Sequence, residues 1–123
     1  MHNIEEKLIK EMELDNHQKI KILDISKKIS IDGYLVAMVA RMNVAVEQKL
    51  FSDNDLSLND FDNIRKKLGT HVLFEYTNQR NFIMAKNKDE ILQELVDTFI
   101  DNMIEYLSKE SFPKKLVLKR YRE

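Results

Sequence analysis

The sequence has no cysteine and no tryptophan, and it contains only two glycines, Gly33 and Gly69, and one proline, Pro113. Without cysteine there can be no disulfide, no thiolate metal ligand and no cysteine nucleophile. So few turn-forming residues argue against an all-β fold, in which strands need frequent turns. Two isolated glycines also cannot build a phosphate-binding or dinucleotide-binding loop.

Length and charge place the chain among small single-domain proteins. It has 123 residues, of which 43% are hydrophobic and 33% are charged, enough for one core. The net charge of −1 does not favour general binding to polyanions. The N-terminal segment is mixed in charge and lacks the apolar stretch of a signal peptide, and no run reaches the ~20 apolar residues of a membrane span. By default we expect a cytoplasmic protein.

Apolar residues recur at helical spacing along most of the chain, which predicts a mainly α fold. We expect a compact bundle of four to five helices, with the apolar helix at 33–51 in the centre and a long helix at 88–109 packed along it. A loop rich in Asp, Asn and Ser is expected at 52–59. The predicted helices cover about 3–14, 17–29, 33–51, 57–68 and 88–109.

The segment 70–85 has two interpretations. Its β-branched and aromatic residues, interrupted by the polar stretch 77–81, indicate a short β-hairpin. The spacing of Leu68, Val72 and Tyr76 also fits the continuation of the preceding helix, and the helical context of the chain favours that reading slightly.

The last ten residues differ in charge from the rest of the chain. They carry five basic residues and one acidic residue, a net charge of 5 − 1 = +4, whereas the other 113 residues carry 15 − 20 = −5. We therefore divide the chain into a helical domain at 1–113 and a basic C-terminal tail at 114–123, which can contact phosphate or an acidic surface. The candidate interaction residues of this tail are Lys114, Lys115, Lys119, Arg120 and Arg122.

No group of residues predicts catalysis, a cofactor or a metal. The acidic residues of the 88–109 helix lie opposite its apolar face, so we expect them to point into water. They also lack the Glu-x-x-His pairs of a carboxylate-bridged metal site. The segment 53–57 looks like part of a calcium loop, but Leu58 stands where glycine is needed and Ile64 where glutamate is needed. Catalytic, cofactor-binding and metal-binding residues are accordingly expected to be absent.

A helix-turn-helix pattern is the one composite motif. In the segment 24–42 the apolar positions are spaced as in many such motifs, and Arg41 is the first residue of the second helix suited to reading bases. If 70–85 were a hairpin, its tip at 78–81 would act as a wing, with Asn78, Gln79 and Arg80 able to touch DNA. The apolar character of the would-be recognition helix counts against this interpretation.

The sequence therefore predicts a non-enzymatic interaction protein, such as an adaptor, a small chaperone or a regulatory subunit. We expect it to act through helix faces on a protein partner and to self-associate, with a homodimer as the expected assembly. The alternative is a small DNA-binding regulator, which the net charge makes less favoured. No membrane partner is expected.

Overall fold

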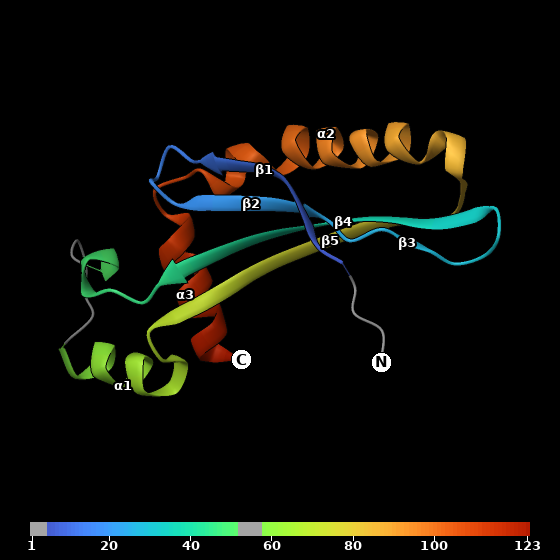
Figure 1. The fold of residues 1–123 in the computed structure, drawn as a ribbon. Helices are drawn as coiled ribbons and strands as arrows, with labels where there is room; N and C mark the ends of the chain where they lie inside the picture. Colours follow the sequence, from blue (N-terminus) through green and yellow to red (C-terminus); the bar gives the residue numbers. More distant parts are fainter. Residues whose placement is uncertain (1–4, 52–57) are drawn as a thin grey trace.

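The computed structural model describes residues 5–51 and 58–123, and it is a mixed α/β fold built on an antiparallel sheet (Figure 1). The predicted bundle of four to five helices is therefore wrong. Most of the expected loop at 52–59, with the segment 53–57, lies outside the described residues. The strands are β1 (Lys7–Glu13), β2 (Lys19–Asp24), β3 (Lys27–Lys28), β4 (Gly33–Ala45) and β5 (His71–Met84). The helices are α1 (Leu58–Leu68), α2 (Lys88–Leu107) and α3 (Phe112–Arg122), with short 3-10 turns at Gln48–Phe51 and Ala85–Asn87.

The sheet is organised around β4. On one side β4 pairs with β2 through Met38 to Met42 and with β3 through Tyr34 and Leu35. On its other side β4 pairs with β5 over almost its whole length. β1 pairs only with β2 and β3 only with β4, so β1, the short β3 and β5 each have an unpaired edge among the described residues.

The segment 33–45 forms this central strand and not the predicted helix. On one face Val36, Met38 and Met42 are fully buried, and on the other face Ala37 is buried as well. A strand that is buried on both faces has no regular polar positions, so its sequence is a continuous apolar run that helical spacing also fits. Its valines favour the extended backbone. The helix-turn-helix predicted at 24–42 is also wrong, because the residues of its second helix belong to the strand β4.

The first two predicted helices, 3–14 and 17–29, are also wrong, because most of this part of the chain forms a β-hairpin and the short strand β3. Along β2 lysines and isoleucines alternate: Ile20 and Ile22 are fully buried, whereas Lys19 and Lys21 are exposed. This period of two places Ile20 and Ile22 on the helix-covered face of the sheet, whereas Leu23 lies on the open face with the lysines.

Asn16 joins the β1–β2 turn to the end of α2. Its side chain is buried, and its Nδ2 donates hydrogen bonds to the carbonyls of Leu107 (2.8 Å) and Lys109 (2.9 Å). Its Oδ1 accepts a bond from the backbone N–H of Gln18 at 3.1 Å. Carbonyls at a helix C-terminus have no partner within the helix, so the asparagine satisfies that of Leu107 and, through Lys109, also ties the turn to the segment that follows α2.

The segment 70–85 is neither a helix nor a hairpin, because 71–84 is a single strand. Near its end a bulge leaves Asn81 and Phe82 opposite Leu35 alone. Phe82 has a φ of 56°, in the left-handed region that bulky side chains rarely adopt. The polar residues that suggested a turn therefore lie within a strand, and β4 holds them there.

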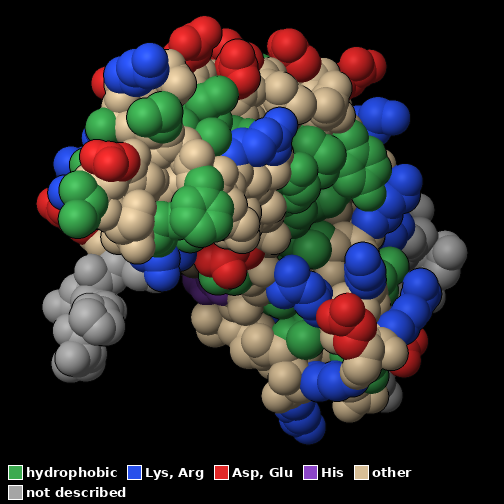
Figure 2. Space-filling model, turned by 90° about the vertical axis from the view of Figure 1, so that its right-hand side faces the viewer, with side chains coloured by type: hydrophobic (Ala, Val, Ile, Leu, Met, Phe, Trp, Pro, Cys, Tyr) green, Lys and Arg blue, Asp and Glu red, His purple; other side chains and the backbone are tan. Residues whose placement is uncertain are grey.

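The helix predicted at 88–109 is confirmed as α2. It lies along one face of the sheet (Figure 1) and buries Leu95, Val96 and Phe99 there. Its acidic residues are exposed, as expected, and acidic side chains follow one another along the top of the molecule, where α2 lies (Figure 2). These exposed residues are Glu90, Glu94, Asp97, Asp101 and Glu105.

We predict that Asn16→Ala lowers the free energy of unfolding by about 1–3 kcal/mol, because it leaves the buried carbonyl of Leu107 without the donor that Asn16 supplies. Chemical denaturation at neutral pH measures this loss. Asn102→Ala, on the exposed side of α2, is the matched control and should change stability by roughly 0.5 kcal/mol or less. Equal stability of the two variants would contradict the role assigned to Asn16.

Candidate interaction site

The basic segment 114–123 belongs to α3, which is fixed to the body of the protein. Phe112, Leu116 and Val117 are buried. The ring of Phe112 lies against Phe74 of β5 and Tyr106 of α2, with centroid distances of 5.8 and 5.3 Å and edge-on geometry. The segment is thus a helix packed into the core, and its cations are carried on a rigid element.

A signal for this helix was present in the sequence. Pro113 stands in the first turn, the position where its fixed φ suits a helix and its missing N–H costs nothing. The apolar residues Phe112, Leu116, Val117 and Tyr121 follow at helical spacing. The many charged residues between these apolar positions obscured the pattern, because a run of charged residues usually indicates a solvent-exposed segment.

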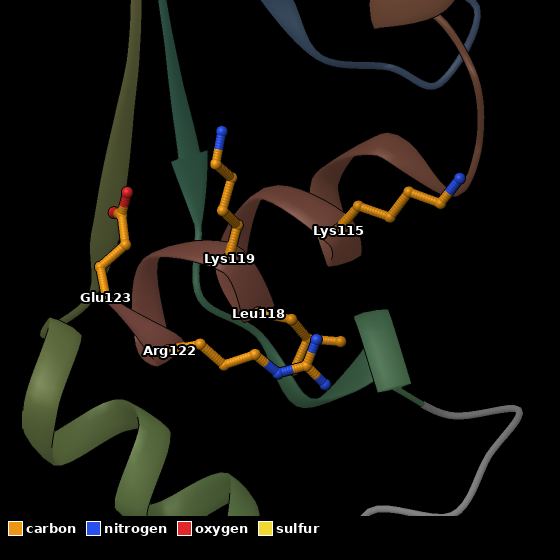
Figure 3. Close-up of a pocket in the computed structure, with 5 residues that line it drawn as sticks. All are labelled: Lys115, Leu118, Lys119, Arg122 and Glu123. Atoms are coloured by element: carbon orange, nitrogen blue, oxygen red, sulfur yellow. The ribbon is translucent and has the colours of Figure 1, made fainter.

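Three of the five candidate cations line one hollow of about 470 Å³ (Figure 3). Lys115, Lys119 and Arg122 stand at spacings of four and three, which is one face of a helix, and all three are exposed. Leu118 and Glu123 complete the lining. In Figure 3 the guanidinium of Arg122 lies beside Leu118, while the two lysines extend outward from the helix.

α1 holds the end of this helix. The Lys67 ammonium donates hydrogen bonds to the carbonyls of Tyr121 (2.5 Å) and Glu123 (3.0 Å) and lies 5.3 Å from the centre of the Tyr121 ring. A cation at this position also complements the negative end of the helix dipole. Since Arg65 and Lys66 precede Lys67 in the last turn of α1, the two helices bring their basic ends together.

The remaining candidates of the segment differ in environment. Arg120 lies 3.7 Å from the carboxylate of Glu123 and is partly neutralised, and Lys114 is half-buried at the start of the helix. By contrast, Lys115, Lys119 and Arg122 form no ion pair with any residue that the structure describes. Exposed cations without partners are free to bind anionic groups from outside the molecule.

A second charged group lies on the sheet face opposite the helices. The Arg41 guanidinium donates to both carboxylate oxygens of Glu6 (3.0 and 2.7 Å) and, through Nε, to Glu75 at 2.6 Å. These hydrogen bonds raise the pKa of Arg41, and the bond from Arg41 lowers the pKa of Glu6. A hollow of about 930 Å³ lies beside them, lined also by Lys21 and Leu73.

The structure does not bring together the four residues expected to contact DNA in the alternative interpretation. Arg41 is on the central strand and is occupied by two carboxylates, so it offers no free guanidinium to a phosphate. Asn78, Gln79 and Arg80 lie within β5 with their side chains on alternating faces, and no hairpin tip brings them together.

Within the described ranges no cluster of three or more His, Cys, Asp or Glu is arranged to hold a metal ion. None of the described helices is long and apolar enough to cross a membrane. Comparison of the chain with protein-family models, with curated proteins and with solved structures gave no match.

We predict that Glu6→Gln destabilises the protein at neutral pH and that the effect disappears in acid. The folded-state pKa of Glu6 is lowered from its ordinary 4.5, so its contribution is fully present above that value and is lost as the pH falls through the lowered pKa. Thermal unfolding of both proteins from pH 7 to pH 2 measures the difference. Glu5→Gln is the control, and a difference that persists at the lowest pH would contradict the prediction.

Proposed function

We propose that the protein is a non-enzymatic interaction protein that docks onto an acidic protein surface through the basic face of α3. The observation that carries this proposal is the grouping of Lys115, Lys119 and Arg122 on a helix whose opposite side is buried; all three are exposed and form no ion pair within the part of the chain that the structure describes. A rigid helix loses little conformational entropy on binding. Its charges would steer and orient the partner, and Leu118 supplies an apolar contact among them.

Three features favour a protein partner over nucleic acid. The chain as a whole carries a net charge of −1, and the exposed acids of α2 would repel a long phosphate backbone. The segment 24–42 forms strands, so it provides no recognition helix for the major groove. The basic face is short, about two helical turns, and suits a local acidic patch better than a polymer.

We predict that the triple variant K115E/K119E/R122E binds a fluorescein-labelled polyglutamate peptide about tenfold more weakly than the wild type, or worse. Three exposed ion pairs at roughly 0.5 kcal/mol each amount to about that factor. Fluorescence anisotropy measures the affinity at several salt concentrations, and wild-type binding should weaken as salt rises. A random DNA duplex titrated in parallel should bind weakly or not at all.

The matched control is K7E/K10E/K109E, which reverses three exposed lysines elsewhere and changes the net charge equally. It should bind the peptide like the wild type. Charge reversal is preferred to truncation at Pro113, because truncation would remove the buried Leu116 and Val117. Tight duplex binding that the α3 variant abolishes would replace the proposal with a nucleic-acid function, and equal loss in both triple variants would refute a specific site.

A further inference from the structure

β5 is a long edge strand. It has 14 residues, whereas strands usually have about five or six, and it pairs with β4 alone among the described residues. Along the outer edge of such a strand, every second residue points its main-chain N–H and C=O away from the sheet. The chemical complement of this row is another extended strand.

The sequence of β5 lacks the usual features that block pairing at an edge. Residues 71–84 contain no proline, no glycine and no lysine. The two full charges are Glu75 and Arg80, and Glu75 is already bound by Arg41. Between them lies an uncharged stretch, Tyr76–Gln79. The bulge at Asn81–Phe82 ends the regular part of the strand, so a partner strand can pair over about 71–80.

Apolar side chains accompany the free edge on both faces of the sheet. Leu73 is 43% exposed on the open face, and Tyr106 of α2 is 47% exposed on the helix-covered face. Tyr106 adjoins the Phe112–Phe74 contact, and Tyr76 lies against Phe99 with ring centroids 5.3 Å apart. A strand added to β5 would therefore gain apolar contacts on both faces as well as main-chain hydrogen bonds.

We propose that the β5 edge pairs antiparallel with β5 of a second copy of this chain, about a two-fold axis that passes through Thr77. An axis at Glu75 or at Arg80 would place identical charges directly opposite each other, which is unfavourable. An axis within the uncharged stretch avoids both clashes and uses the regular part of the strand on each side.

A second copy fits this edge for two reasons. Two-fold pairing joins the two sheets into one and covers both β5 edges at once, so the assembly closes at the dimer. Pairing over about 71–80 also contributes about ten residues from each copy, with side chains of α2 in addition, towards the roughly 20–30 residues a side of a stable interface. The proposal is independent of the α3 site, which carries its cations on a different element.

The decisive experiment places like and then opposite charges at the proposed axis. Wild type should sediment as a dimer at micromolar concentration. Thr77→Lys and Thr77→Glu, both at an exposed position, should each raise the dissociation constant about tenfold or more, because identical charges then meet across the axis. An equimolar mixture of the two variants should recover the dimer. Recovery shows that both variants are folded and that the lost dimer reflects repulsion.

Thr98→Lys, exposed on α2, is the matched control and should leave the dimer intact. Because the chain has no cysteine, Thr77→Cys adds a single thiol, which a short bismaleimide should cross-link to the same residue of the other copy, while Thr98→Cys should remain uncoupled. A monomeric wild type would overturn the proposal and leave the edge to a strand of another protein. A dimer that survives both charge variants, or fails to cross-link at position 77, would also overturn it.

Discussion

The structure depends on the burial of the middle of β4, residues 36–40, on both faces. This one strand pairs with β2 and β3 on one side and with β5 on the other, and its row from Val36 to Val44 supplies the floor on which α2 packs. Met38 and Met42 are fully buried and contribute flexible side chains that fill the space beneath the helix. The buried residues of β4, of its neighbouring strands and of the three helices form a single hydrophobic core.

Acidic and basic side chains are concentrated on different secondary-structure elements, and this distribution gives the protein surfaces of different charge. The acids of α2 face water on one side, while the ends of α1 and α3 join their cations on another, held together by Lys67. On the open face of the sheet the opposite charges neutralise each other around Arg41. The first two surfaces therefore present unbalanced charge to a partner, and the α3 face gathers its cations beside an apolar side chain, Leu118.

Some parts of this arrangement could be predicted from single segments, and others could not. The helix at 88–109 could be predicted because one of its faces is exposed to water, which gives its sequence a clear hydrophobic period of 3.6 residues. β4 could not be recognised as a strand because residues 36–40 are buried on both faces, which removes the alternation of apolar and polar residues there. β5 was misread because the polar stretch 77–81 has turn-like composition, and only pairing with β4 keeps it extended. The helix at 112–122 was discernible from its apolar spacing but was masked by its charges.

The sequence by itself determined the size of the core, the long amphipathic helix with its solvated acids, the absence of thiol chemistry and the concentration of cations in the last ten residues. These are properties of composition and local period, which act without distant contacts. Tertiary structure alone decided that 33–45 is a central strand, that Asn16 binds the end of α2, that Arg41 is neutralised and that β5 pairs with β4 alone among the described strands. Each of these depends on residues far apart in the chain, whose pairing no local pattern encodes.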